Sequence, residues 1–568
     1  MIFRICFIYF ILYFTTCSKQ ELKPEKADLI LIDGTVITLD SLNTTTESLA
    51  IKDGKIMWAG KTKDVEALID ANTIIIDLQG KYAYPGLIEG HGHFSSLGQS
   101  LQNLYFLQDT SWVQSISRVA NKTTQINTND WIIGRGWHHE KWKNNTEPFI
   151  KGWPSNEKLN AISKNIPVIL HHASGHAIMA NKKAMDLANI NNETTNPDGG
   201  VIVRNEAGEA TGIFEETAEN LILKAYENHL TTKTETERLT DWYDAIDLAQ
   251  AHCLKNGITS FQDAGASYDE LKRYQEMAEA GKLKVRLWAM ISDSQEGFEE
   301  GIRDYPVIGA GNNFFTCRAV KSYMDGALGS FGAWLLKSYE DKEDFYGQNI
   351  TSLDKIEAVA NLAITGNLQH CIHAIGDKAN REVLNIYEKT FKNNTDKTDL
   401  RWRIEHAQHI DLADIPRFAN LGVIASMQAI HCTSDAPFVE KRLGKERAKN
   451  SAYPWRTLMD NKVLITNGTD TPVEAISPIA NFYASVTRQS KYMDEPFYPK
   501  QKMTRMEALK ALTMNNAFAA FEENVKGSLE IGKLADITVL DKNLLTCAEN
   551  EILKTEVFLT IVNGAISK

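Results

Sequence analysis

The sequence predicts an α/β fold, a (β/α)8 TIM-like barrel with a small β-sandwich domain built from both chain termini and an inserted subdomain after the first barrel strand. Three observations predict it. In the middle of the chain, short apolar runs alternate with helical patterns, which is typical of βαβ units and a parallel sheet. At both ends, apolar runs are interrupted by Asp-Gly or Asn-Gly pairs, which favour β-hairpins. A segment of about residues 100–245 is too long to be a βα connection.

The terminal β domain is predicted from two regions. Residues 27–40 and 49–60 are short apolar runs joined or broken by Asp-Gly pairs, and residues 535–540 and 557–562 repeat this pattern near the C-terminus. Asp-Gly between two such runs is a strong hairpin signal. We therefore expect one composite β domain from residues 27–82 and 520–568.

The barrel is predicted over residues 83–519. Its first strand is the run into Gly86-Leu87-Ile88-Glu89, and the other seven candidate strands are 258–262, 284–291, 316–321, 368–373, 400–405, 422–427 and 462–467. The chemistry of such a barrel lies at the carboxyl ends of its strands. We expect the insert at about 100–245 to cap that end.

The first 17 residues predict an export signal. Arg4 supplies an early positive charge, and the apolar run over residues 5–14 is too short to span a bilayer. The run ends at Cys17, as at a bacterial lipoprotein cleavage site, where the cysteine carries the lipid. The alternative is an ordinary cleaved signal in which Cys17 has no role. We expect an exported protein, periplasmic or a membrane-anchored lipoprotein if bacterial and otherwise secreted.

Composition limits the partners. The 568 residues carry a net charge of −12 and are 43% hydrophobic and 24% charged, which is ordinary for a globular protein. An acidic chain without a long Lys/Arg run argues against a nucleic-acid partner. A small-molecule substrate is the expectation, and a homo-oligomer stays open.

Candidate metal ligands recur after the predicted strands. His91 and His93 lie two residues apart, so both imidazoles point to the same side of an extended segment. Lys321, His373, His406 and Asp470 each follow a later strand. Imidazole and carboxylate ligands suit zinc, so we expect one or two zinc ions per chain.

At these residues the sequence resembles the metal-dependent amidohydrolase superfamily, in particular amidohydrolase family 3, which includes N-substituted formamide deformylases. The resemblance covers about residues 27–568. The motifs that carry it are PGLIEGHGH (85–93), GRGW (134–137), SGHA (174–177), DGALGS (325–330), HAIGD (373–377), RIEHAQ (403–408), GTDTPV (468–473) and GSLEIGKLAD (527–536).

The resemblance implies roles for individual residues. His91 and His93 would bind one metal, a carbamylated Lys321 would bridge two metals, and His373 and His406 would bind the second. Asp470 would bind metal and carry the proton, and His176 or the second metal would polarise the carbonyl. The resemblance also places Trp137 near the substrate pocket, and Glu215 and the segment Gln428 to His431 along the cavity. For Lys321, an alternative is a salt bridge with Asp325.

These expectations lead to one function and three alternatives. The first interpretation is an amidohydrolase that cleaves an amide, formamide or related C–N bond by attack of a zinc-activated hydroxide. The alternatives are an esterase, a mononuclear deaminase on the same barrel, or a catalytically silent, surface-anchored binding protein. Bound metal per chain distinguishes the mononuclear deaminase, which has no use for Lys321 as a ligand.

Overall fold

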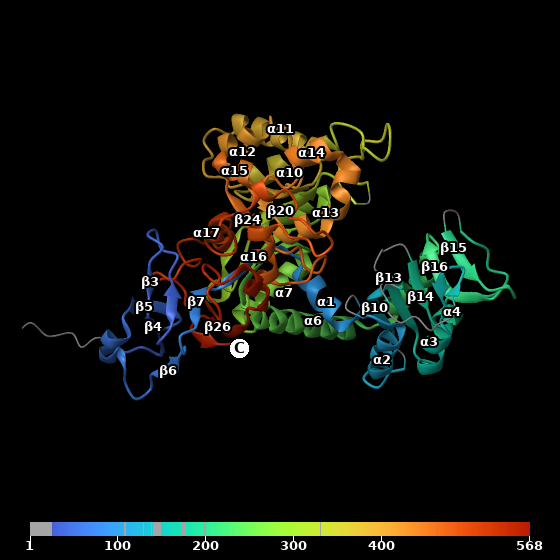
Figure 1. The fold of residues 1–568 in the computed structure, drawn as a ribbon, viewed down its shortest axis with the longest axis horizontal. Helices are drawn as coiled ribbons and strands as arrows, with labels where there is room; N and C mark the ends of the chain where they lie inside the picture. The colour runs from blue at the N-terminus through green and yellow to red at the C-terminus, as the bar shows by residue number, and fades with distance from the viewer. Residues whose placement is uncertain are drawn as a thin grey trace, which may run out of the picture.

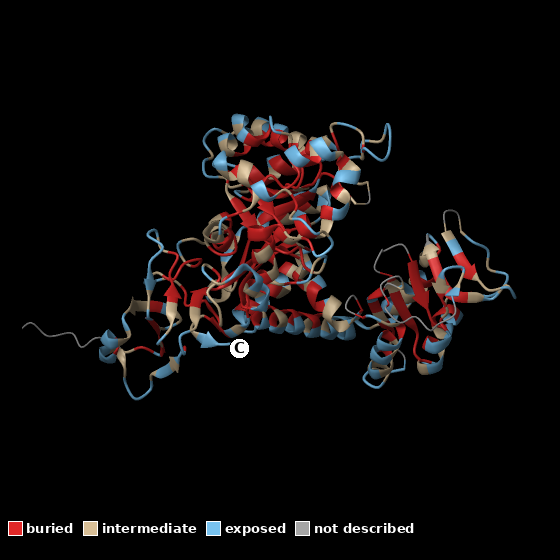
Figure 2. Ribbon diagram, viewed as in Figure 1, coloured by how far each residue is buried: buried red, intermediate tan, exposed pale blue. Residues whose placement is uncertain are grey.

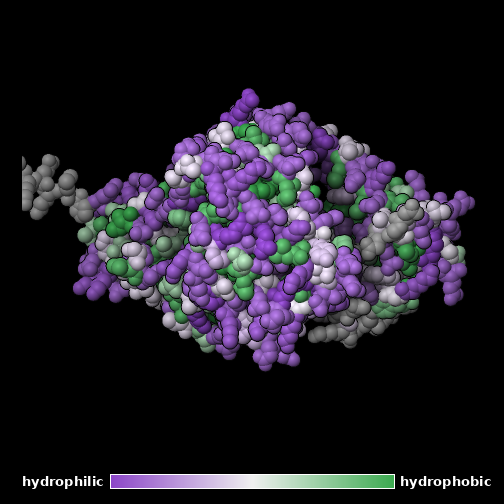
Figure 3. Space-filling view, turned by 90° about the horizontal axis from the view of Figure 1, so that it is seen from above, coloured by the Kyte–Doolittle hydropathy of each residue, from purple (hydrophilic) through white to green (hydrophobic). Residues whose placement is uncertain are grey.

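The computed structural model describes residues 25–567 except 107–108, 129, 138, 140–141, 143–148, 173–176, 198–199 and 330. The predicted export signal at residues 1–17, with Cys17, lies outside the described residues. Within them, no helix combines the length and apolar character needed to cross a membrane. The face of the molecule in Figure 3 is largely hydrophilic, with scattered hydrophobic patches.

The centre of the molecule is a parallel barrel, which confirms the predicted α/β TIM-like barrel. Its strands are β8 (Leu87–Gly92), β17 (Ile258–Ala266), β18 (Arg286–Ile291), β20 (Phe315–Tyr323), β21 (Gln369–Ala374), β22 (Arg403–His406), β23 (Ile424–Met427) and β24 (Ile465–Asn467). They are ordered in the sheet as in the chain, and the short β19 (Val307–Gly309) pairs antiparallel with β20 outside this order. All eight predicted strands are present. Figure 2 shows the barrel strands as the most buried part of the centre.

The barrel closes between its first and last strands. The backbone N–H of Asp470, just after β24, donates to the His91 carbonyl at 2.7 Å, and the His93 N–H donates to the Thr471 carbonyl at 2.8 Å. Helices cover the outside, among them α7 (Tyr268–Glu279), α10 (Leu353–Thr365), α11 (Asp377–Asn393), α12 (Ile415–Leu421), α13 (Ala429–Leu443) and α16 (Pro478–Thr487). The closure brings the segment after β24 beside the end of β8.

Two further sheets contain strands from the chain ends. One has the order β27-β26-β25-β7-β2-β3, and the other has the order β5-β4-β1-β6. The strands are β1 (Leu29–Ile32), β2 (Thr35–Ile37), β3 (Thr45–Thr46), β4 (Ser48–Lys52), β5 (Lys55–Gly60), β6 (Ile74–Asp77), β7 (Tyr82–Pro85), β25 (Ile537–Leu540), β26 (Val557–Val562) and β27 (Ala565–Ile566). Leu31 and Ile51 of one sheet and Ala83, Ile537 and Ile561 of the other belong to one apolar cluster. The division into domains at residues 82 and 520 stays a prediction.

The predicted Asp-Gly hairpins have mixed outcomes. Asp53-Gly54 connects the antiparallel pair β4 and β5, and Asn563-Gly564 connects β26 and β27. A hairpin at Asp33-Gly34 is wrong, because β1 pairs with β4 and β6 whereas β2 pairs with β3 and β7. Asp33 adopts a left-handed φ of 53°. The chain therefore turns there from one sheet into the other, and both edges of each strand are already occupied.

Between β8 and β17 the chain forms a separate mixed sheet of order β15-β16-β14-β13-β10-β9. Its strands are β9 (Leu104–Tyr105), β10 (Ile132–Trp137), β13 (Val168–His172), β14 (Ala177–Ala180), β15 (Gly200–Arg204) and β16 (Ala210–Glu216). The chain leaves the barrel through α1 (Phe94–Gln102) and returns through α6 (Glu235–Lys255). A Cβ on Gly98 would lie 2.0 Å from the Ala245 carbonyl oxygen, so glycine permits this close approach of the two helices.

Figure 1 shows the inserted segment on the side of the barrel where α1 and α13 lie. These helices begin just after the carboxyl ends of β8 and β23. The segment is thus on the side toward which those strands point. That it caps the site stays a prediction.

Candidate metal centre

The carboxyl ends of the barrel strands bring predicted ligands together. Oδ1 of Asp470 lies 3.6 Å from Nε2 of His91 and 3.3 Å from Nε2 of His93. The His406 ring centroid is 4.7 Å from that of His91 and 4.4 Å from that of His373. Four histidines and one carboxylate from β8, β21, β22 and the loops after β8 and β24 therefore form one cluster.

Two triads within the cluster have ligand atoms close enough to share one ion. In His91, His93 and Asp470, and in His406, His431 and Asp470, the candidate ligand atoms lie within 4.8 Å of one another. Nε2 of His91, Nε2 of His373 and Oδ1 of Asp470 are buried and have no hydrogen-bond partner among the described residues. Leaving each such atom unsatisfied costs about 1–3 kcal/mol. A cation held between His91, His93 and Asp470 would satisfy the first and the last of these atoms, so the residues present fit a metal.

Glu405 fixes the orientation of His91. The carboxylate of Glu405 accepts a short hydrogen bond from Nδ1 of His91, and both side chains are fully buried. The proton therefore stays on Nδ1, and the lone pair of Nε2 faces the cluster. Nε of Arg403 lies 2.7 Å from Oε1 of Glu405 but is not aligned for a hydrogen bond, so this contact is mainly Coulombic, whereas Nη2 donates to Oε2 at 3.1 Å.

Gln428 fixes His406 in the same way. Nδ1 of His406 lies 2.7 Å from Oε1 of Gln428, whose Nε2 donates to the Ser426 carbonyl at 3.2 Å. The amide oxygen thus accepts the Nδ1 proton. His406 and Asp470 have left-handed φ values of 74° and 58°. Such backbone is costly for non-glycine residues and is concentrated at functional sites.

The electrostatics favour neutral imidazoles around an anion. Burial, together with the charge of Lys321, lowers the pKa of His91 to about 4 and that of His373 to about 3. Burial also opposes ionisation of Asp470, but the neighbouring imidazoles, first of all that of His93, hold the pKa of this carboxyl well below its ordinary value. At neutral pH His91, His373 and Asp470 are therefore in the forms that bind a cation.

Lys321 is buried in β20 beside this cluster. Burial lowers the pKa of its amine, opposed by the charges of Glu405 and Asp470. The alternative, a salt bridge to Asp325, does not match the structure. Asp325 accepts hydrogen bonds from the backbone N–H groups of Trp334, Ile375 and Gly376 at 2.8–2.9 Å. In the described part of the chain, no ion pair to Lys321 forms within 4.0 Å.

Sequence reasoning missed the roles of Glu89 and Glu405. Oε2 of Glu89 accepts from the Thr469 hydroxyl at 2.9 Å, and Oε1 accepts from the backbone N–H groups of Thr469 and His91. Glu89 therefore ties β8 to the loop that carries Asp470. The signal for Glu405 was its spacing from Arg403. Two residues that lie two positions apart in a strand point to the same face, and opposite charges on a buried face must pair because an unpaired buried charge is costly.

The other predicted residues do not join the cluster. Trp137 is fully buried in the core of the inserted segment, where its Nε1 donates to the Leu170 carbonyl at 2.8 Å. Glu215 of β16 accepts from Nε1 of Trp153 at 2.9 Å. These contacts are within the insert, so their substrate-binding roles stay predictions. His176 lies outside the described residues.

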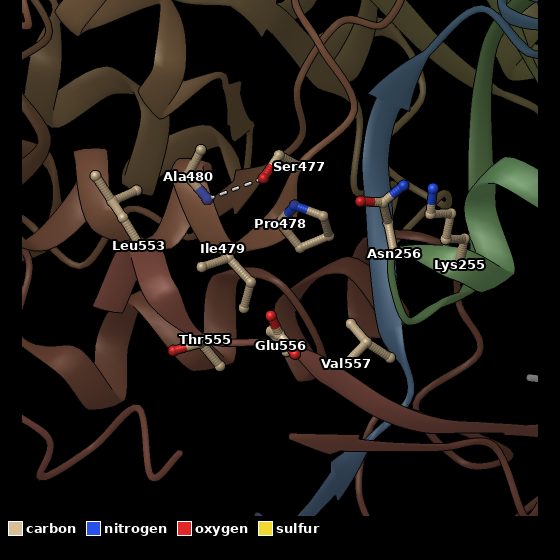
Figure 4. A pocket seen from close by; sticks show the side chains of 10 residues that line it. All are labelled: Lys255, Asn256, Ser477, Pro478, Ile479, Ala480, Leu553, Thr555, Glu556 and Val557. Atoms are coloured by element: carbon tan, nitrogen blue, oxygen red, sulfur yellow. Dashed lines mark hydrogen bonds between the residues drawn. The ribbon is translucent and has the colours of Figure 1, made fainter. Parts of the chain in front are cut away.

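A surface pocket elsewhere is separate from the cluster. It has a volume of about 280 Å³ and is lined by the end of α6, the start of α16, and residues 553–557 (Figure 4). Its lining includes Lys255, Ser477 and Glu556 but no histidine. None of the predicted ligands lines this pocket.

Comparisons with known proteins match this architecture. A sequence model of the amidohydrolase family matches residues 75–567. Protein LONG AFTER FAR-RED 3 of Arabidopsis thaliana is 30% identical over 91% of this chain and 88% of its own. The N-substituted formamide deformylase of Arthrobacter pascens is 26% identical over 95% and 98%. The crystal structure of an uncharacterised metal-dependent hydrolase from Pyrococcus horikoshii OT3 is 27% identical, covers 92% of this chain and 99% of its own, and has a TM-score of 0.72.

Proposed function

The chain belongs to the amidohydrolase family, and from this premise we propose that it is a zinc-dependent hydrolase that cleaves an amide, formamide or related C–N bond in a small molecule. The observation that carries the proposal is the cluster itself. His91, His93, His406 and Asp470 converge at the strand ends, and among the described residues Nε2 of His91 and Oδ1 of Asp470 are buried without a hydrogen-bond partner. The similarity to a formamide deformylase over nearly the whole chain supports the choice of bond.

The residues divide into two ligand sets. His91, His93 and Asp470 would hold one ion, while His373, His406 and a carbamate on Lys321 would hold a second. Lys321 supports this because it is a buried amine with a lowered pKa and no ion pair to a described residue. A bound zinc ion lowers the pKa of water to about 7 and polarises a carbonyl.

The protein's own residues handle the proton. The anionic Asp470 accepts one proton from the attacking water, while the water oxygen forms a bond to the carbonyl carbon. The C–N bond then breaks, and Asp470 passes the proton to the leaving nitrogen, so that an acid and an amine are released. Glu405 and Gln428 keep His91 and His406 in fixed orientations, which avoids reorganisation during the reaction.

The test combines metal analysis with a substrate panel. The protein lacking residues 1–17 is loaded with zinc, its zinc per chain is measured by mass spectrometry, and N-formyl amines, N-acyl amines and matched esters are assayed. We expect about two zinc ions per chain and hydrolysis of at least one amide, faster than that of its ester. Full zinc loading without hydrolysis of any amide would contradict the proposed function. A single zinc ion would favour the mononuclear alternative.

We also propose that the protein is exported and carries a lipid on Cys17. The support is the sequence of the first 17 residues alone. Cys17→Ala should abolish incorporation of a labelled fatty acid in cells. Unchanged labelling would exclude this residue as the anchor.

A further inference from the structure

His431 lies beside Oδ2 of Asp470, whereas His91 and His93 lie beside Oδ1. It lies in the first turn of α13, is 8% exposed, and places Nε2 3.8 Å from Oδ2 of Asp470. This distance is too long for a hydrogen bond, and Nε2 is buried without a hydrogen-bond partner in the part of the chain that the structure describes. The atom is therefore available to something that enters the site.

The partner of Nδ1 decides what Nε2 can do. Nε2 of the Gln408 amide lies 3.1 Å from Nδ1 of His431. An amide nitrogen donates only, so Nδ1 must accept, and the single proton of a neutral imidazole then sits on Nε2. His91 and His406 have the opposite arrangement, because oxygens of Glu405 and Gln428 accept their Nδ1 protons. These two histidines offer lone pairs to the cluster, whereas His431 offers an N–H group.

We propose that His431 is a catalytic hydrogen-bond donor to the carbonyl oxygen of the substrate and is not a metal ligand. The inference rests on the proposed function. As the water oxygen bonds to the carbonyl carbon, the C=O electron pair moves to oxygen, which accepts a hydrogen bond from the Nε2–H of His431. The proton stays on His431, and Asp470 still carries the proton that reaches the leaving nitrogen. Removing one such donor typically lowers kcat by about 10²–10³-fold.

The start of α13 is held in place for this role. The backbone N–H of Ala429 donates to Oδ1 of Asn467 at 3.0 Å, and the N–H of Ile430 donates to Oδ1 of Asn481 at 3.0 Å. Both asparagine side chains are buried. A donor that is fixed before the substrate arrives needs no reorganisation as negative charge develops.

The experiment separates a donor from a ligand. His431→Leu removes the N–H, His431→Gln keeps an amide donor, and His406→Gln removes a proposed ligand. His370→Gln is the matched control, since His370 is fully buried, binds the Ser322 hydroxyl at 2.9 Å and contacts the rings of Tyr387 and Trp402. Zinc affinity is measured by chelator competition, and kcat and KM are measured with the best amide of the panel.

We expect His431→Leu to retain zinc affinity within about twofold while kcat falls by about 10²-fold or more, and His431→Gln to recover part of kcat. His406→Gln should lose zinc affinity. The control His370→Gln should have the zinc affinity and kcat of the wild type. Loss of zinc affinity in His431→Leu equal to that in His406→Gln would overturn the proposal, as would an unchanged kcat. If the wild type hydrolyses no amide, the proposed function fails, but the zinc measurement still decides whether His431 is a ligand.

A second variant tests the tautomer without removing His431. Gln408→Glu places a carboxylate beside Nδ1, which should draw the proton from Nε2 to Nδ1. Histidine ¹⁵N spectra of the zinc-loaded protein should show the His431 proton on Nε2 in the wild type and on Nδ1 in Gln408→Glu, with kcat reduced. Gln408→Met serves if the buried carboxylate prevents folding, and should lower kcat without affecting zinc affinity. A wild-type spectrum with the proton on Nδ1 of His431 would overturn the assignment.

Discussion

Replacing Glu405 with glutamine should weaken metal binding and destabilise the barrel together. The change keeps the shape of the side chain but removes its charge, which serves His91 on one side and Arg403 on the other. Removing one member of a buried ion pair costs about 3–5 kcal/mol. In the variant, the guanidinium of Arg403 still donates hydrogen bonds to oxygens of Gln262, Gly90 and Ser426 at 2.6–2.9 Å. We therefore expect a loss of stability at the lower end of this range.

Zinc affinity should fall as well, because His91 loses the anion that orients and polarises its ring. Loss of such a supporting partner typically costs about 10–100-fold in metal affinity. Chelator competition at pH 7 measures the affinity, and urea unfolding of the metal-free protein measures the stability. Glu388→Gln, at a surface ion pair with Lys392 and Arg417, is the control and should leave both unchanged. Wild-type zinc affinity and an unchanged urea midpoint in Glu405→Gln would refute this reasoning.

Three further outcomes are expected. Asp470→Asn should lower kcat by about 10²–10⁴-fold, because an amide does not take the proton from water; full activity in a steady-state assay would remove Asp470 from the mechanism. Lys321→Ala should lower zinc content and activity together, and a short carboxylic acid in excess should restore part of both; full zinc content and rate would exclude the bridging role. A hydrogen bond from Arg456 lowers the pKa of Glu507 from 4.5 to about 2, so its stabilising effect is complete above about pH 4.5 and declines as the pH falls toward 2. The difference in urea stability between Glu507→Gln and the wild type should therefore shrink over that range, and a constant difference would contradict the assignment.

The barrel was predictable because each strand is a short apolar run followed by a helical pattern. Such hydrophobic patterns are local in the sequence and predict secondary structure directly. The convergence of His91, His93, His373, His406 and Asp470 was predictable for the same reason, since each follows a strand and the barrel brings the strand ends together. That they bind metal stays a prediction.

The supporting contacts were not predictable from local patterns. Glu405 reaches His91 across a separation of 314 residues, and Glu89 reaches Thr469 across 380. Gln408 and His431 meet because a loop after β22 folds beside the start of α13, which periodicity does not show. The wrong hairpin at Asp33-Gly34 has a related cause, because turn chemistry specifies a change of direction but not which sheet the next strand joins.

The most direct test is a crystal structure of the zinc-loaded protein with anomalous diffraction measured on both sides of the zinc absorption edge. The proposed site predicts an anomalous peak bonded to His91, His93 and Asp470, and a second one beside His373, His406 and a carbamylated Lys321. Nε2 of His431 should bond to neither. A fully loaded protein whose zinc peaks all lie away from Asp470 would contradict the metal centre on which the proposed hydrolase activity depends.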